Sequence, residues 1–317
     1  MKNGIKFGIA GAIAIAVIVS STPSSILGTD LFDGGDDRSA INTQTSEQNT
    51  LRIGYFPNIS HAQAVIGLGN GDFQRALGDV QVTTQIFNAG PSAIEALFAN
   101  QIDVTYIGPN PAINGYVQSN GEALRVISGA ASGGAVFVVR NDSGINSPQD
   151  LANKKFSSPQ LGNTQDVALR NYLLDNGYNT RDKGGNVEII PARTADIVSM
   201  MTQKDIDGAW IPEPWGAKLI KEANAKVLVD ERDLWPEGQF VTAHIIARTD
   251  YLEENPEIIK KLLEANIDET NWINNNRAAA IGAFNVELQK LTGQTIAEDV
   301  LNASLSRIDF TYDPVRL

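Results

Sequence analysis

Cysteine is absent from the 317 residues, and histidine occurs only twice, as His61 and His244. Without cysteine the chain can form no disulfide, no thiolate zinc site and no iron–sulfur cluster. It also has no cysteine nucleophile and no lipid-modified N-terminal cysteine. Two histidines are too few for an imidazole-rich metal cage. We therefore expect neither a bound metal nor a cofactor.

Positive charge is also scarce. Lysine and arginine number 25 against 37 aspartates and glutamates, which gives a formal net charge of −12. Because nucleic-acid binding needs a clustered basic surface, we exclude nucleic acid as a partner. Hydrophobic residues make up 42% of the chain, which is ordinary for a globular protein, and the length allows one large domain or two smaller ones.

The first residues resemble an export segment. Residues 1–28 contain Lys2 and Lys6, then an apolar run that ends at Val19, and the 23 residues after Lys6 carry no charge. This pattern is typical of a secretory signal peptide, and it could also span a bilayer as an N-terminal membrane anchor. Both alternatives place the rest of the chain outside the cytoplasm, in the periplasm or at the cell surface. The polar segment 29–50 predicts a flexible linker.

From residue 51 onward, short β-rich runs alternate with helical segments. Leu51–Phe56 and Val104–Ile107 predict strands, while Ala93–Asn100 and Gln165–Asn176 predict helices. Such alternation predicts an α/β fold with largely parallel sheets. Ligands of such folds bind beyond the carboxyl ends of the strands, where loops lead into helices.

The loops at these predicted strand ends contain small, neutral, hydrogen-bonding residues and no lysine or arginine. A helix N-terminus offers unpaired N–H groups and about half a positive charge, so several together can bind an anion without a cationic side chain. The same residue types also cap helices and form turns, which is the simpler interpretation for any single loop. The candidate neutral donors are Ser60, Ser92, Asn110, Ser132, Asn163, Thr164 and Gln165.

Enzymatic motifs are not apparent. Neither His61 nor His244 occurs in the spacing of a hydrolytic triad, and there is no nucleophile elbow. The glycine-rich segment Ser132-Gly133-Gly134 lacks both the Walker lysine and the dinucleotide-binding pattern. For each histidine, a structural role and a ligand contact remain open.

Glu213 and Trp215 occur in a loop that Pro212 and Pro214 stiffen. In one interpretation, the indole forms an aromatic wall with the acid nearby, able to contact an amine or a partner protein. In the other, a packed tryptophan and a glutamate simply begin a helix. The residues alone leave both interpretations open.

Several segments in order along Leu51–Asp313 carry a family resemblance. They are Ile53-Gly54-Tyr55-Phe56-Pro57-Asn58, Asn88-Ala89-Gly90-Pro91, Gly108-Pro109-Asn110-Pro111-Ala112, Gly162-Asn163-Thr164-Gln165-Asp166, Glu213-Pro214-Trp215 and Asp233-Leu234-Trp235-Pro236. With these segments the chain resembles the periplasmic substrate-binding proteins of ABC importers, in the group that serves nitrate, taurine and aliphatic sulfonates.

The resemblance implies the type II periplasmic-binding-protein fold, in which two α/β lobes close on a ligand around a hinge of two crossover strands. By this analogy the crossover strands are Ala135–Arg140 and Thr242–Arg248. Lobe 1 is then expected at 51–138 and 245–317, and lobe 2 at 139–244.

The resemblance also implies which loops face the cleft between the lobes. Together with the neutral loops, it predicts a ligand-binding set of fifteen residues: Asn58, Ser60, His61, Gly90, Pro91, Ser92, Asn110, Ser132, Gly133, Asn163, Thr164, Gln165, Glu213, Trp215 and His244.

The function that the resemblance implies is that of an extracytoplasmic solute-binding protein. We expect a monomer that captures a small sulfonate-like anion, taurine or an alkanesulfonate, and delivers it to an ABC permease in the membrane. Alternatives are a binder of nitrate, bicarbonate or a pyrimidine precursor, or a pyrimidine-synthesising enzyme on the same scaffold. Such enzymes carry a cysteine-rich motif, so the absence of cysteine counts against enzymatic activity.

Overall fold

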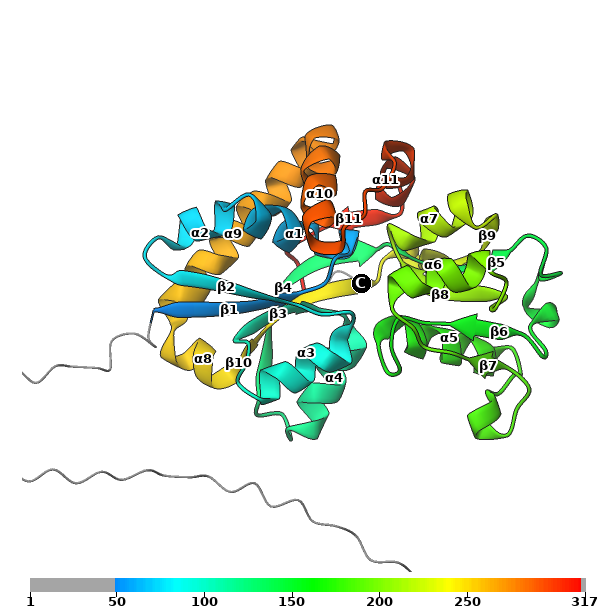
Figure 1. Ribbon diagram of the computed structural model, residues 1–317. Coiled ribbons are helices and arrows are strands. Elements are labelled where there is room, and N and C mark those ends of the chain that lie inside the picture. The colour runs from blue at the N-terminus through cyan, green and yellow to red at the C-terminus, as the bar shows by residue number, and fades with distance from the viewer. Residues whose placement is uncertain (1–48, 315–317) are drawn as a thin grey trace, which may run out of the picture. The chain divides into compact units, whose positions relative to one another are not determined.

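Two β-sheets flanked by helices make up residues 49–314, the part of the chain that the computed structural model describes (Figure 1). The predicted export segment, 1–28, and nearly all of the predicted linker, 29–50, lie outside the described residues. Among residues 49–314, no helix combines the length and the apolar character that crossing a membrane requires.

The first sheet has six strands in the order β11-β4-β10-β3-β1-β2. Strand β1 is parallel to β2 and β3, whereas β10 is antiparallel to β3 and β4, and β11 is antiparallel to β4. The bounds are β1 Thr50–Tyr55, β2 Gln81–Ile86, β3 Val104–Ile107, β4 Leu124–Gly133, β10 Val241–Arg248 and β11 Ile308–Phe310.

The second sheet has five strands in the order β7-β6-β8-β5-β9. Here β6 is parallel to β7 and β8, while β5 is antiparallel to β8 and β9. The bounds are β5 Ala135–Arg140, β6 Lys155–Ser157, β7 Glu188–Ile189, β8 Gly208–Pro212 and β9 Ala225–Asp230.

The α/β class agrees with the prediction, but the expectation of largely parallel sheets is wrong, because both sheets are mixed. Parallel neighbours arise where a helical crossover returns the chain to the same sheet. The chain instead enters β5 from the first sheet, at Gly134, and enters β10 from the second sheet, between Asp230 and Val241. Both strands run antiparallel to their neighbours. The predicted lobe boundaries, at 138/139 and 244/245, fall inside these two strands, and the division into lobes stays a prediction.

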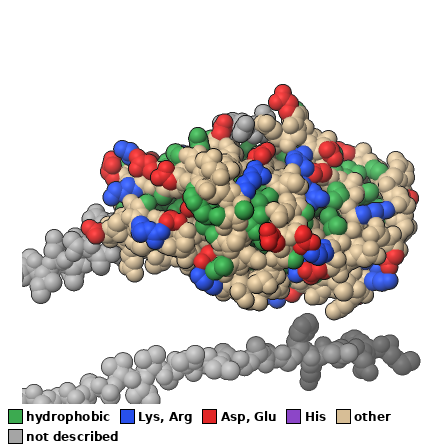
Figure 2. Space-filling view, turned by 90° about the horizontal axis from the view of Figure 1, so that it is seen from above, with side chains coloured by type: hydrophobic (Ala, Val, Ile, Leu, Met, Phe, Trp, Pro, Cys, Tyr) green, Lys and Arg blue, Asp and Glu red, His purple; other side chains and the backbone are tan. Residues whose placement is uncertain are grey.

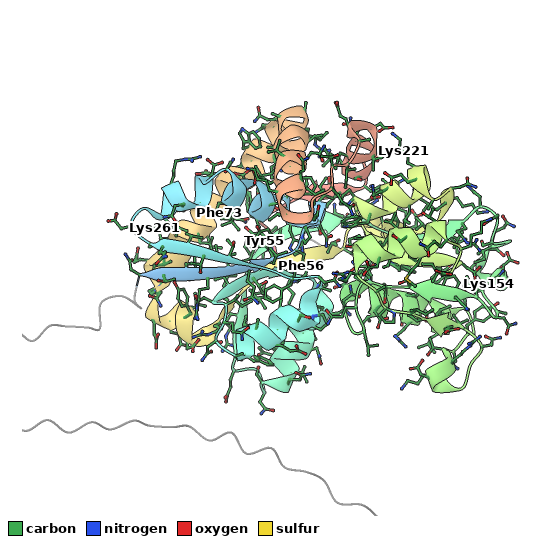
Figure 3. The ribbon with its side chains drawn as sticks, in the orientation of Figure 1. Tyr55, Phe56, Phe73, Lys154, Lys221 and Lys261 are labelled. Carbon is green, nitrogen blue, oxygen red and sulfur yellow. The ribbon has the colours of Figure 1, made fainter. Side chains whose placement is uncertain are left out.

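Helices bury both faces of the first sheet. Figure 1 shows α1, α2, α9 and α10 on one side and α3 and α4 on the other. Tyr55 and Phe56, neighbours at the end of β1, belong to the two different cores on these sides (Figure 3). The bounds are α1 Ala62–Gly69, α2 Asp72–Leu77, α3 Gly90–Phe98, α4 Pro109–Gln118, α8 Thr249–Glu254, α9 Pro256–Asn275, α10 Arg277–Thr292 and α11 Glu298–Leu305.

The second sheet is buried on both faces in the same way, and β5 shows why. Val136 and Val138 pack in the core with α6 and α7, whereas Phe137 and Val139 pack with α5. Side chains of a strand alternate between the two faces, so this apolar run of β5 serves both cores. The bounds are α5 Thr164–Asp175, α6 Thr194–Thr202 and α7 Trp215–Glu222.

Candidate ligand-binding site

A cavity lies where loops that follow strands of both sheets meet. Its volume is about 20 Å³, which is room for about one water molecule, so a larger ligand requires the surrounding loops to move apart. None of the described lining residues is charged, although Lys, Arg, Asp and Glu side chains are interspersed on the outer face in Figure 2. The lining is Phe56, Asn58, Ser60, His61, Asn88, Ala89, Gly90, Gly108, Pro111, Pro159, Asn163, Thr164, Gln165, Pro212 and Thr242.

Three helices, α3, α4 and α5, have their N-terminal residues in this lining. Helix α5 begins at Thr164 because Asn163 caps it, with its side-chain oxygen accepting the Asp166 N–H at 2.8 Å. The first-turn N–H groups of a helix have no acceptor within the helix, and they carry its positive partial charge. Pro91 in α3 and Pro109 and Pro111 in α4 have no N–H group, so these two helices offer fewer donors than α5. The dipoles of all three helices still suit the cavity to an anion.

The hydroxyl of Thr164 has no hydrogen-bond partner among residues 49–314, although the residue is only 7% exposed. Buried hydroxyls are nearly always hydrogen-bonded, so this group points to a missing acceptor. Gly108 at the start of α4 approaches it closely, because a Cβ there would lie 2.1 Å from Thr164 Oγ1. Glycine at 108 thus allows the loops from the two sheets to meet.

His61 is a neutral donor at the cavity. Its Nδ1 accepts the Phe56 N–H at 3.3 Å, which assigns the ring proton to Nε2. Burial lowers the pKa of His61 from 6.5 to about 3. The imidazole therefore offers an N–H group without a positive charge.

Asn58 and Trp215 join the two sides of the site. Trp215 is 1% exposed, and its Nε1 donates to Asn58 Oδ1 at 3.0 Å. This bond occupies the amide oxygen and leaves Asn58 Nδ2 to donate. Trp215 itself does not line the cavity, so its position behind Asn58 orients that side chain.

Glu213 is fully buried behind the cavity and is held by three groups of the protein. Its Oε1 accepts from Arg307 Nη1 at 2.7 Å, and its Oε2 accepts from Ser304 Oγ at 3.1 Å and the Ala217 N–H at 2.8 Å. The structure therefore favours the structural interpretation of this carboxylate over a ligand contact.

Asp166, the other carboxylate in the predicted loops, is also occupied. It accepts from Ser158 Oγ at 2.8 Å, the Gly162 N–H at 2.9 Å and Arg170 Nε at 2.9 Å. With 1% exposure, its role is to brace the loop before α5.

Of the fifteen predicted site residues, the structure brings seven to the cavity: Asn58, Ser60, His61, Gly90, Asn163, Thr164 and Gln165. It does not bring the other eight into the lining: Pro91, Ser92, Asn110, Ser132, Gly133, Glu213, Trp215 and His244. Ser92 is hydrogen-bonded to Gln160 at 3.0 Å, Ser132 Oγ accepts the Phe240 N–H at 3.3 Å, and His244 Nε2 lies 3.2 Å from the Pro314 carbonyl oxygen.

Sequence reasoning missed several lining residues that lack a conspicuous functional group. Phe56, Gly108 and Pro212 supply surface or space rather than hydrogen bonds. Their positions at the ends of strands are the only feature of the sequence that indicates they line the cavity. Asn88 could have been included as a donor, but its Nδ2 donates to the Pro159 carbonyl oxygen at 2.8 Å and so connects the two sides.

Residues 44–284 match the NMT1-like family, and the chain belongs to it. It is 26% identical over 186 residues to the taurine-binding periplasmic protein of Escherichia coli, covering 57% of this chain and 54% of that one. It is 25% identical over 256 residues to the nitrate/nitrite binding protein NrtA of a Nostoc species, covering 74% and 56%. The chain thus spans about half the length of the curated relatives it matches.

The solved structure of the alkanesulfonate-binding protein SsuA from Xanthomonas axonopodis pv. citri, bound to MOPS, has the same fold. It superposes with a TM-score of 0.70 at 19% identity, covering 84% of this chain and 87% of that one. The resemblance and the fold predicted from the motifs are confirmed.

Proposed function

We propose that this protein is the extracytoplasmic solute-binding protein of an ABC importer. It captures a small sulfonate-like anion, taurine or an alkanesulfonate, in the cavity between the two sheets and delivers it to a membrane permease. The observation that carries this proposal is an uncharged cavity at the N-termini of α3, α4 and α5. Two relatives are named as a taurine-binding protein and a nitrate/nitrite binding protein, which supports a small anion as the ligand of this protein.

The charge of the ligand follows from the chemistry of the lining. Helix N-termini and neutral donors stabilise a single negative charge at short range. The net charge of −12 acts over a longer distance, which salt screens within about 8–10 Å. A singly charged anion fits this balance better than a multiply charged one.

The proposed function is tested by a ligand screen on the purified protein. Thermal unfolding is recorded with ethanesulfonate, taurine, nitrate and bicarbonate, and each compound that raises the melting temperature is titrated by calorimetry. Saturable one-to-one binding of a sulfonate supports the proposal. Binding of nitrate or bicarbonate alone would assign the protein to the alternative ligand, and no response to any of them would refute anion capture.

Replacing Thr164 with valine is expected to weaken binding of the sulfonate about 10- to 150-fold, because a hydrogen bond to a charged group contributes about 1.5–3 kcal/mol. Valine keeps the shape of the side chain and removes only the unpartnered hydroxyl. Calorimetric titration measures the effect. The Thr164→Ser variant keeps the hydroxyl and serves as the control. Equal affinities of the valine and serine variants would show that the Thr164 hydroxyl does not bind the ligand.

Binding of the sulfonate is expected to be independent of pH between about pH 5 and about pH 8. The pKa of His61 is lowered to about 3 by burial, so its donor stays neutral throughout this range. Titrations at three pH values measure this. An affinity that rises as the pH falls below about 6.5 would show instead that His61 binds the anion as an imidazolium.

A further inference from the structure

We propose that the cavity selects anions whose remaining part is uncharged and apolar, and that it discriminates against ligands that also carry an ammonium group. This inference rests on the proposed function and narrows its ligand class. Between the two sulfonates named there, it favours an alkanesulfonate over taurine. Three features of the site carry it: the occupied carboxylates, the occupied acceptors and the apolar part of the lining.

The two carboxylates of the predicted cleft loops, Glu213 and Asp166, are already neutralised by the protein. Glu213 forms an ion pair with Arg307 at 2.7 Å, and Asp166 forms one with Arg170 at 2.9 Å. Neither lines the cavity. An ammonium group in the cavity would therefore lose its hydration without gaining a counter-ion, and an unpaired buried charge is strongly unfavourable.

Three of the four side-chain amide oxygens of the lining are occupied as well. Asn58 Oδ1 accepts from Trp215, Asn163 Oδ1 accepts from the Asp166 N–H, and Gln165 Oε1 accepts from Asn163 Nδ2 at 3.1 Å.

The same holds for two further acceptors at the cavity. The Pro159 carbonyl oxygen accepts from Asn88, and His61 Nδ1 accepts from the Phe56 N–H.

These bonds occupy the acceptor atoms of the side chains and leave N–H groups of the same side chains free to donate. Asn58 Nδ2, Gln165 Nε2 and His61 Nε2 can each donate, in addition to the Thr164 hydroxyl. A ligand made only of acceptors, such as a sulfonate head, satisfies them. An ammonium group has three donors and no acceptor, and of these four groups only the neutral Thr164 hydroxyl has an oxygen free to accept from it.

Apolar side chains supply a third of the lining, five of its fifteen residues. Phe56, Ala89, Pro111, Pro159 and Pro212 offer side-chain surface without hydrogen-bonding groups. This surface suits a short alkyl substituent, whose burial is favourable in proportion to its area. Replacing a hydrogen of that substituent with an ammonium group removes this gain.

The test compares ethanesulfonate with taurine, which is the same molecule with an ammonium group on its second carbon. Calorimetric titration of the full chain is expected to give an affinity for ethanesulfonate about 10- to 100-fold higher than for taurine. Taurine binding as tightly or more tightly would overturn this inference while leaving anion capture intact. Binding of neither compound would overturn the proposed function itself.

A second variant tests the electrostatic cause. Gln165→Glu places a carboxylate in the lining and keeps an acceptor for Asn163 Nδ2. We expect it to reduce the ratio of the ethanesulfonate affinity to the taurine affinity at least about 10-fold. Its thermal unfolding shows whether it is folded. An unchanged ratio in a folded variant would contradict the absence of a counter-ion as the basis of selection.

Discussion

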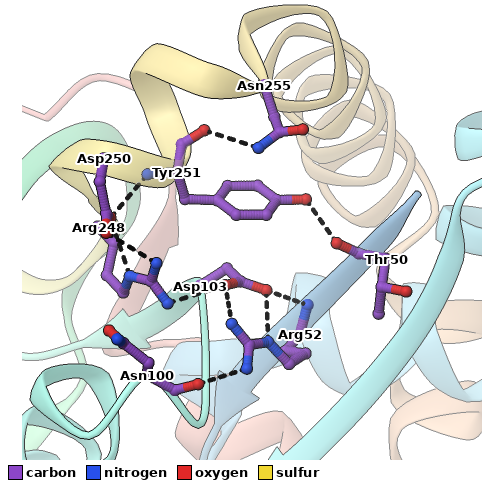
Figure 4. Close-up of polar contacts among 8 residues, drawn as sticks. All are labelled: Thr50, Arg52, Asn100, Asp103, Arg248, Asp250, Tyr251 and Asn255. Carbon is purple, nitrogen blue, oxygen red and sulfur yellow. Dashed lines mark hydrogen bonds and ion pairs between the residues drawn. The ribbon is translucent and has the colours of Figure 1, made fainter. Parts of the chain in front are cut away.

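Replacing Asp103 with asparagine is expected to lower the free energy of unfolding by about 2–4 kcal/mol. Asp103 is fully buried and accepts from the backbone N–H and Nε of Arg52, both at 2.9 Å, and from Arg248 Nη1 at 3.3 Å (Figure 4). It thereby connects β1 with the end of β10. The estimate lies below that for a fully buried pair because the Arg52 side chain is 37% exposed.

Chemical denaturation measures this effect, with Glu222→Gln as the matched control. Glu222 also pairs with a cation, Lys218 at 2.7 Å, but its side chain is 43% exposed. Because exposed pairs contribute little, we expect a loss below about 0.5 kcal/mol for the control. A loss in Asp103→Asn no larger than in the control would contradict the role of Asp103 as a buried connection between strands.

Replacing Gly108 with alanine is expected to weaken ligand binding about 5- to 150-fold while the protein stays folded. The backbone of Gly108, with φ −72°, suits alanine, but the new Cβ would lie 2.1 Å from Thr164 Oγ1. Overpacking of this kind costs about 1–3 kcal/mol. The two loops follow strands of different sheets, so separating them relieves the clash at the expense of the ligand site.

Calorimetric titration measures the effect of Gly108→Ala, and Gly282→Ala is the control. A Cβ at Gly282 in α10 would meet no atom within 4 Å. The control should bind with unchanged affinity. Unchanged binding by Gly108→Ala would show that the ligand does not need the close approach of α4 and α5.

Local signals in the sequence predicted individual elements well. The predicted helix Gln165–Asn176 differs by one residue at each end from α5, Thr164–Asp175, because Asn163 is a strong cap next to it in sequence. The predicted strand Leu51–Phe56 is likewise shifted by one residue from β1. Strand direction was not predictable in this way, because it depends on where β5 and β10 enter their sheets.

The site shows the same division between local and distant information. The loop Asn163–Gln165 reaches the cavity as its neutral composition suggested. The Glu213 carboxylate is hydrogen-bonded by Arg307, which lies 94 residues away in the sequence. Nothing local to Glu213 indicates that partner, so the sequence left open whether its carboxylate was available to a ligand.

We expect the uncharged cavity at three helix N-termini to bind a small singly charged anion. A crystal structure of the protein with ethanesulfonate would locate the bound anion. We predict sulfonate oxygens within hydrogen-bond distance of Thr164 Oγ1 and His61 Nε2, with the ethyl group toward Phe56. A sulfonate bound instead against lysine or arginine side chains outside this cavity would contradict the claim.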